Sequence, residues 1–105
     1  MITTIVNFKL PAAMTLAQAE AAFNGSASKY QGLPGLVRKY YLISEDGLTA
    51  GGVYLWRSRR DAEQLYTEEW REFIRGKYGC EPEVSYFASP VIVDNPQPAS
   101  ARTGA

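Results

Sequence analysis

Apolar side chains recur along this chain with two different periods, and the order of these periods restricts the fold more than any other feature. Alternate apolar or β-branched residues predict strands, and apolar residues at every third or fourth position predict helices. Strand-like runs occupy residues 2–9, 36–43, 50–56 and 83–93, and helix-like stretches follow Thr15 and Ser58. Strand, helix, strand, strand, helix, strand is the βαββαβ order.

This order predicts an α+β, ferredoxin-like fold. Right-handed crossovers place both helices on one face of a four-stranded antiparallel sheet. The chain has 105 residues, the size of one domain. We place this domain at residues 1–94 and a flexible tail at residues 95–105, where Pro, Ser, Gly and Ala predominate.

Both helix-like stretches begin with a capping sequence. Thr15 and Gln18 have the spacing of a capping box, and Ser58 opens the second stretch in the same way. The predicted buried stripe of the first helix is Leu16, Ala19, Phe23, Ala27 and Tyr30. That of the second is Ala62, Leu65, Tyr66, Trp70, Phe73 and Ile74, and Gly76 and Gly79 are expected to end it.

Glycine and proline mark further features of the strands. Gly47 predicts a hairpin turn after the second strand. Gly51 and Gly52, inside the third strand, indicate either a bulge or a close approach of two backbones. Pro90 places the last strand at an edge or gives it a kink.

The strands are apolar on both faces. Strict alternation points Val37, Tyr41 and Ile43 one way and Leu36, Tyr40 and Leu42 the other, with Tyr54 and Trp56 opposed to Val53 and Leu55. Two helices cover only one face of such a sheet. We therefore expect a homodimer in which the second faces of two sheets pack together.

Composition excludes several classes of protein. Eleven Lys and Arg balance eleven Asp and Glu, so binding to nucleic acid or to an anionic membrane is not expected. The chain has no His, which excludes His-dependent catalysis, and its single cysteine, Cys80, allows no internal disulfide. With no transmembrane run and no signal-peptide pattern, we expect a cytoplasmic protein.

The segment from Gly35 to Trp56 (GLVRKYYLISEDGLTAGGVYLW) resembles the YdhR-type monooxygenase family of the dimeric α+β barrel superfamily. The marks of the resemblance are the turn Pro34-Gly35, then Lys39 and Tyr41 on one strand, and the run Gly51-Gly52-Val53-Tyr54-Leu55-Trp56. The similarity extends from Ile2 to about Asp94. The superfamily includes cofactor-independent antibiotic and quinol monooxygenases and haem-degrading monooxygenases.

The resemblance implies a ligand cavity between the helices and the sheet, with the other sheet face in a dimer interface. In oxygenating relatives an Asn and a Trp flank the substrate, and no metal, flavin or nicotinamide is needed. Asn7 and Trp70 are the corresponding residues here. Haem-degrading relatives use a His to hold the iron, so we do not expect haem degradation.

The candidate catalytic residues are Asn7, Trp70 and Lys39, and the candidate substrate-binding residues are Tyr41, Tyr54, Trp56, Phe73 and Tyr66. Each has a structural alternative. Asn7 could bond only to the backbone, and Lys39, with Arg38, could form a salt bridge at the rim of a dimer. The aromatic residues could be ordinary core or interface. Either Tyr40 or Tyr41 could face the helices, with Tyr41 preferred.

The resemblance, together with an aromatic cavity that has no metal ligands, implies a monooxygenase without metal or flavin that oxidises an electron-rich aromatic, such as a hydroquinone or an anthrone, with O2. The base that deprotonates the substrate remains open among a lysine, a tyrosine with a lowered pKa, and a carboxylate. The alternatives are a non-oxygenating binding protein, a cyclase or isomerase that uses the same cavity, and a structural dimer module.

Overall fold

The strands and helices follow the predicted order, except that the second helix is divided. The computed structural model describes residues 1–96, so most of the predicted tail lies outside the described residues. The elements are β1 (Ile2–Lys9), α1 (Leu16–Tyr30), β2 (Leu36–Ile43), β3 (Thr49–Trp56), α2 (Arg59–Leu65), α3 (Glu68–Tyr78) and β4 (Glu83–Ala88).

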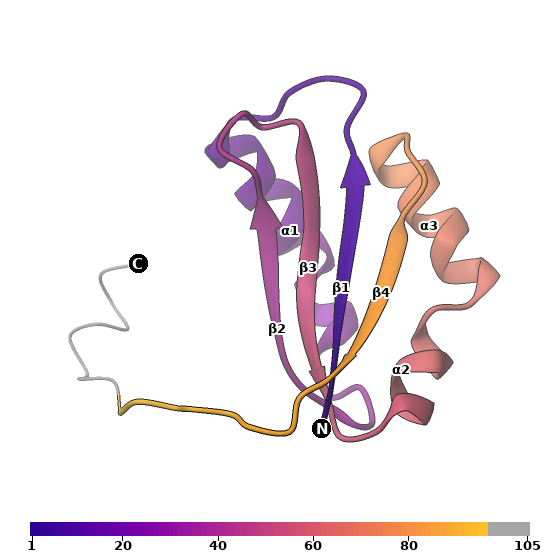
Figure 1. Ribbon diagram of the computed structural model, residues 1–105. Coiled ribbons are helices and arrows are strands. Elements are labelled where there is room, and N and C mark those ends of the chain that lie inside the picture. The colour runs from indigo at the N-terminus through magenta and orange to yellow at the C-terminus, as the bar shows by residue number, and fades with distance from the viewer. Residues whose placement is uncertain (97–105) are drawn as a thin grey trace.

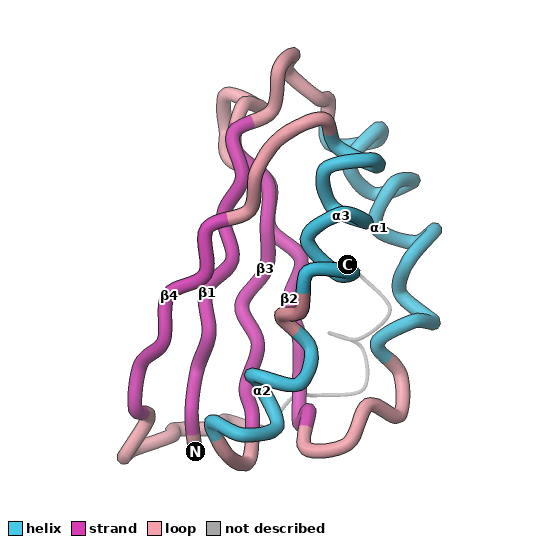
Figure 2. Tube along the Cα trace, turned by 90° about the vertical axis from the view of Figure 1, so that its right-hand side faces the viewer, coloured by secondary structure: helices cyan, strands magenta, loops and turns pink. Residues whose placement is uncertain are grey.

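The strands form one antiparallel sheet in the order β2-β3-β1-β4 (Figure 1). Seen from the side, the helices lie on one face of this sheet and leave the other face open (Figure 2). The predicted ferredoxin-like α+β fold is therefore confirmed. The N-terminal strand lies inside the sheet, where β3 and β4 flank it.

The second helix differs from the prediction because its chain bends between Tyr66 and Thr67. Thr67 starts a new helix, with its Oγ1 atom accepting a hydrogen bond of 3.3 Å from the Trp70 N–H. Gly76 lies inside α3, and only Gly79, at a φ of 74°, ends the helix. On α1, Leu16 is exposed, and Ser26 takes a buried position that the stripe assigned to Ala27.

Two strand predictions were also wrong in detail. A bulge between Leu36 and Arg38 turns Leu36 toward the helices and leaves Val37 exposed, which reverses the alternation expected for these two residues. β4 ends at Ala88 instead of Val93, and Ser89 makes the last backbone bond, to the Met1 carbonyl. Pro90, which has no N–H group, follows.

The core lies between the sheet and the helices, and Trp56, Val6 and Thr4 are its most deeply buried large side chains. The open face of the sheet also exposes apolar side chains, as predicted, beside polar residues such as Asn7 and Lys9. Tyr40 is 56% exposed there and Phe87 51%.

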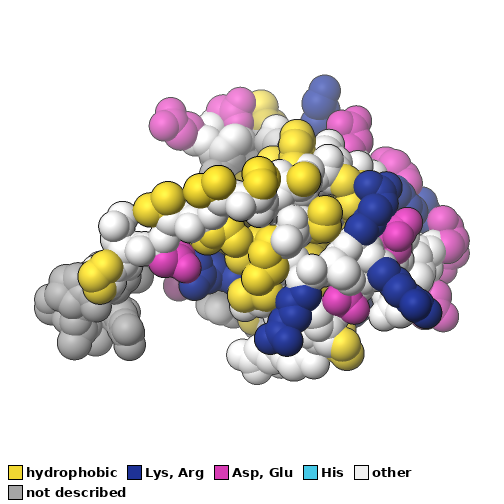
Figure 3. All heavy atoms as spheres, turned by 60° about the horizontal axis from the view of Figure 1, so that its bottom comes forward, with side chains coloured by type: hydrophobic (Ala, Val, Ile, Leu, Met, Phe, Trp, Pro, Cys, Tyr) yellow, Lys and Arg dark blue, Asp and Glu magenta, His cyan; other side chains and the backbone are white. Residues whose placement is uncertain are grey.

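After β4, exposed hydrophobic side chains continue along the extended segment of residues 89–96. Figure 3 shows them as a row of spheres on an arm of the molecule. No helix within residues 1–96 is long and apolar enough to cross a membrane.

Candidate functional site

Lys39 extends its side chain from β2 into the space between the sheet and α1. Its Nζ atom lies 3.3 Å from the ring centroid of Tyr30, 3.7 Å from that of Tyr41 and 4.7 Å from that of Tyr54. We call these three rings the tyrosine cage. Gly52 leaves room for the lysine, because a Cβ atom there would lie 3.3 Å from Lys39 Cε.

The surroundings of Lys39 favour its neutral form. No carboxylate of residues 1–96 makes an ion pair with it. Burial, followed by repulsion from Lys77 and Lys29, lowers the pKa of Lys39 to about 6. Attraction to the ring faces favours the ammonium form and offsets part of this shift. Near neutral pH the amine therefore accepts and releases a proton more readily than an exposed lysine does.

The neighbouring tyrosines are shifted in the opposite direction. Burial raises the pKa of Tyr30, Tyr41 and Tyr54, and it raises the pKa of Tyr78 to about 12. These phenols keep their protons near neutral pH. Of the bases left open by the sequence, Lys39 is favoured over a tyrosine.

Tyr30 occupies the centre of the site. Its hydroxyl accepts a hydrogen bond of 3.2 Å from Trp70 Nε1, and its ring meets the rings of Tyr41 and Tyr54 edge-on. On the neighbouring turn of α1, Ser26 Oγ lies 2.9 Å from the Tyr41 hydroxyl. Two hydroxyl groups of α1 therefore hold the cage in place: that of Tyr30, bound to Trp70, and that of Ser26, bound to Tyr41.

Two open clefts lie near the cage. The larger, of about 490 Å³, is lined by Trp56 and Trp70 together with Leu33, Leu65 and Lys29, among others, and we call it the tryptophan cleft. The other, of about 310 Å³, lies at the edge of the sheet beside Lys39, Tyr30 and Tyr41, and we call it the lysine cleft. Within residues 1–96, no set of three or more His, Cys, Asp or Glu side chains is grouped to hold a metal ion.

A buried threonine holds the aromatic side chains at the end of β3. Trp56 Nε1 donates a hydrogen bond of 3.0 Å to Thr4 Oγ1, which also lies 2.6 Å from the Tyr66 hydroxyl. Thr4 is fully buried, so these contacts satisfy polar groups that would otherwise lose water without compensation.

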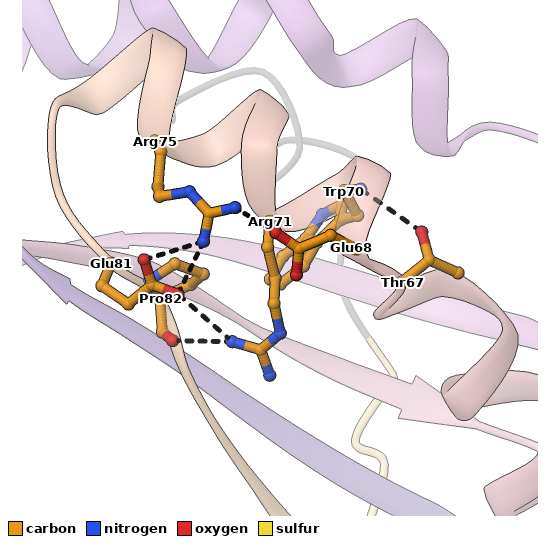
Figure 4. Close-up of polar contacts among 7 residues, drawn as sticks. All are labelled: Thr67, Glu68, Trp70, Arg71, Arg75, Glu81 and Pro82. Carbon is orange, nitrogen blue, oxygen red and sulfur yellow. Dashed lines mark hydrogen bonds and ion pairs between the residues drawn. The ribbon is translucent and has the colours of Figure 1, made fainter.

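Helix α3, which carries Trp70, is tied to the loop before β4. Figure 4 shows Arg75 between Glu68 and Glu81, and Arg71 beside the carbonyl of Pro82. The Arg75–Glu81 contacts measure 3.0 Å and the Arg71–Pro82 bond 3.2 Å. These contacts and the Thr67 cap fix the helix at both ends, and with it the indole of Trp70.

A comparison with known protein families shows to which of them this chain is related. The family described as "Putative mono-oxygenase ydhR" matches residues 4–80. The chain belongs to this family. The resemblance noted in the sequence is thereby confirmed, and the match includes the cage, both tryptophans and the capped helices.

Solved structures show that the ydhR-family chain shares its fold with described oxygenases. A monooxygenase from Streptomyces coelicolor, the ActVA-Orf6 product in complex with nanaomycin D, is 16% identical with a TM-score of 0.67, covering 90% of this chain and 92% of its own. SnoaB, a cofactor-independent oxygenase from Streptomyces nogalater, is 18% identical with a TM-score of 0.64, covering 90% and 97%.

A third structure of the same fold, Rv0793 from Mycobacterium tuberculosis, is 13% identical with a TM-score of 0.61, covering 90% of this chain and 100% of its own. At these identities the likenesses establish the fold alone. A search of curated proteins gave no significant match.

The structure divides the predicted site residues of this ydhR-family chain into groups. Tyr41 and Tyr54 surround Lys39, and Phe73 lies on the adjoining wall. Trp56 and Trp70 line the tryptophan cleft, and Tyr66 packs against both indoles. Tyr41 faces the helices, where its ring stacks on Phe23, whereas Tyr40 points outward.

Asn7 is not part of either group. Its neighbours Val6 and Phe8 are buried under the helices, so Asn7 points to the open face of the sheet and is exposed. It borders a separate open depression of about 450 Å³ beside Cys80 and Glu83, among others. Asn7 and Trp70, which the resemblance implies flank one ligand, therefore lie on opposite sides of the sheet within one chain, because alternate residues of a strand point to opposite faces.

The salt bridge considered for Lys39 and Arg38 is made by Arg38 alone, to Asp94 at 3.3 Å. Tyr30 and Ser26 also belong to the site and were not predicted from the sequence. The signal that could have found them is the polar atom that each carries on the buried stripe of α1.

Proposed function

We propose that this ydhR-family protein is a monooxygenase that needs no metal, flavin or nicotinamide. Its proposed substrate is an electron-rich aromatic of the hydroquinone or anthrone class, and O2 is the oxidant. The supporting observation is Lys39, an amine in an aromatic cage with no acidic partner among the described residues and a pKa lowered to about 6. Two Streptomyces proteins of the same fold support this reaction class: SnoaB, described as a cofactor-independent oxygenase, and the ActVA-Orf6 monooxygenase in complex with nanaomycin D.

The substrate ring is placed in the lysine cleft. Lys39, Tyr30 and Tyr41 border this cleft, and its volume of about 310 Å³ reaches the lower end of the range for small-molecule sites, roughly 300–1,000 Å³. Trp70 acts through its hydrogen bond to Tyr30 and is a positioning residue in this proposal. Tyr54 completes the cage, Trp56 and Tyr66 pack against Tyr54, and Phe73 lies on the adjoining wall.

The reaction begins when the neutral Lys39 amine takes a proton from the substrate, either from a phenol or from the CH2 group of an anthrone. The resulting carbanion or phenolate gives one electron to O2, and the two radicals combine to a peroxide. The ammonium of Lys39 returns its proton to this peroxide, which loses water to leave a carbonyl. For an anthrone, one CH2 group and one O2 give one carbonyl group and one water.

The experiment is oxygen uptake by the protein with a panel of anthrones and hydroquinones, corrected for oxidation without protein. We expect uptake by the natural protein, with a rate that rises with pH near 6 and then levels off as Lys39 loses its proton. Lys39→Met removes the base, and Lys39→Arg keeps a positive charge but does not release its proton near neutral pH. Both variants should lose the activity, while Lys9→Met, on the other face, should keep it.

No uptake above the protein-free rate on any compound would contradict the proposal. If a compound instead raises the melting temperature without consuming oxygen, the protein is a binding protein, cyclase or isomerase that uses the same site. If no aromatic compound changes the melting temperature, the structural module is favoured.

We also propose that the protein is a homodimer joined through the open face of the sheet. Tyr40, Leu42 and Phe87 expose apolar surface there, and exposed Val91 and Val93 follow on the segment after β4. Apolar surface in water costs about 25 cal/mol per Å², which favours covering it with a second copy. Asn7 would lie within this interface.

A further inference from the structure

A third space, much smaller than the two clefts, lies behind Lys39 between the sheet and helices α1 and α3. Its volume is about 10 Å³, and the rings of Tyr30, Tyr41, Tyr54 and Phe73 form its walls together with Ile74 and Lys39. We call it the ring chamber. A space of roughly 10–15 Å³ is the least that holds one water-sized molecule, so the chamber admits nothing larger than a diatomic molecule and no aromatic ring.

The ring chamber and the lysine cleft share part of their walls. Lys39, Tyr30 and Tyr41 line both spaces, so a ring in the cleft and a small molecule in the chamber are separated by one layer of side chains.

The charges around the ring chamber are positive. Lys29 Nζ lies 3.7 Å from the ring centroid of Phe73, and Lys77 Nζ lies 5.8 Å from it while donating a hydrogen bond of 2.7 Å to the Ala22 carbonyl. Neither these lysines nor Lys39 form an ion pair with a carboxylate of residues 1–96. Aromatic walls suit a small apolar molecule, and the ammonium groups stabilise an anion formed from it.

We propose that the ring chamber is the dioxygen site of the reaction and that the Lys39 ammonium stabilises superoxide there; this inference rests on the proposed function. The substrate in the lysine cleft first gives its proton to Lys39. The substrate anion then gives one electron to O2, and the product is a superoxide anion beside the newly formed ammonium. The ammonium thus favours the reduced state of oxygen over neutral O2, which is the requirement for faster electron transfer.

The test uses dissolved O2 as a probe, because it is paramagnetic and speeds the nuclear relaxation of protons that it approaches. A ligand of two heavy atoms binds with a dissociation constant on the order of millimolar at best, and relaxation detects such weak, rapidly exchanging occupancy. In the resting protein, without substrate, we expect larger enhancements at the Ile74 methyls and the Phe73 ring than at the Ala62 methyl, which is fully buried on α2.

Ile74→Phe fills the ring chamber and should remove the extra enhancement, whereas Ile92→Phe, on the segment after β4, should not. If Ile74→Phe does not fold, Phe73→Trp adds bulk from the neighbouring, half-buried wall position. During turnover Ile74→Phe should raise the KM for O2, by roughly tenfold, and leave the KM for the aromatic compound unchanged. For Phe73→Trp the relaxation measurement is the test.

Equal enhancements at Ile74 and Ala62, or an unchanged KM for O2 in folded Ile74→Phe, would overturn the inference. The relaxation measurement needs no substrate, so it tests the chamber even if no compound supports oxygen uptake. Conversely, oxygen uptake without O2 in the chamber would sustain the proposed function and reject this site.

Discussion

At the scale of single residues, Lys39 stands out among the cations of residues 1–96 because three aromatic rings enclose its amine. Arg38, Arg59, Arg71 and Arg75 make ion pairs at the surface. Lys39 is enclosed by the tyrosine cage, and burial of its charge is unfavourable. The site therefore reduces the stability of the fold at low pH.

We predict that Lys39→Met stabilises the protein and that the gain shrinks as the pH rises. The pKa of Lys39 is about 6 in the fold and 10.5 in the unfolded chain. Between these values the unfolded chain holds the proton and the folded chain does not, so the stability of the natural protein rises with pH. The slope is at most about 1.4 kcal/mol per pH unit, and Lys39→Met removes it.

Urea unfolding of both proteins between about pH 6 and about pH 9 measures this difference. Lys9→Met serves as the control, since Lys9 is exposed on the other face of the sheet and its loss should leave the slope unchanged. A natural protein whose stability does not rise with pH relative to Lys39→Met would show that the amine stays charged in the cage.

At the scale of elements, the two glycines of β3 make the site possible by different means. Gly51 lets two strands approach, because a Cβ atom there would lie 1.8 Å from the Val6 carbonyl oxygen. Gly52 clears the space that the Lys39 side chain occupies. The register of β3 with β1 is continuous here, so the close approach expected from the sequence is present and the bulge is not.

We predict opposite effects for two Gly→Ala substitutions. Gly51→Ala forces β1 and β3 apart and should destabilise the fold by several kcal/mol, on the order of 3 or more, or prevent folding. Gly76→Ala lies in the interior of α3 with no atom within 4 Å of the new Cβ, and it should stabilise by up to about 1 kcal/mol. Thermal unfolding of the two variants tests this prediction. Equal melting temperatures would contradict the close approach of β1 and β3 at Gly51.

At the scale of the whole molecule, the sheet separates two surfaces with different roles. Figure 2 shows the helices on one side of the sheet. The cage lies on this side, and Asn7 lies on the other with exposed apolar residues such as Tyr40 and Phe87. One subunit thus contains a complete candidate site, and the second surface is left for association.

We predict that the double variant Tyr40→Glu, Phe87→Glu is monomeric at concentrations where the natural protein is a dimer. Two carboxylates in a covered apolar face would be desolvated without partners, at a cost of several kcal/mol each. Sedimentation velocity measures the change. Leu16→Glu is the matched control, because it adds a carboxylate at an exposed residue that begins α1 on the helical layer. A natural protein that sediments as a monomer at all concentrations would reject the dimer.

The elements and their order could be predicted because their signals are local. The capping box at Thr15, the buried stripe of α1 and the β-branched run of β1 each depend on residues a few positions apart. The break at Thr67 was missed because the apolar stripe continues across it, although a threonine three residues before Trp70 is itself a cap signal. Strand alternation with Val6 and Phe8 already indicates that Asn7 points away from the helices. The prediction that Asn7 lies in the site came instead from the resemblance to the family.

The sequence by itself determined the sheet, the covering helices and the apolar character of both sheet faces, since periodicity and turn residues act within one element. Only the tertiary structure decided that Lys39 enters a cage of rings from α1, β2 and β3, and that Tyr30 rather than Asn7 meets Trp70. Contacts between side chains of different elements depend on how these elements pack and on local irregularities such as the bulge at the start of β2. Periodicity fixes which way a side chain points, and packing alone fixes what it meets.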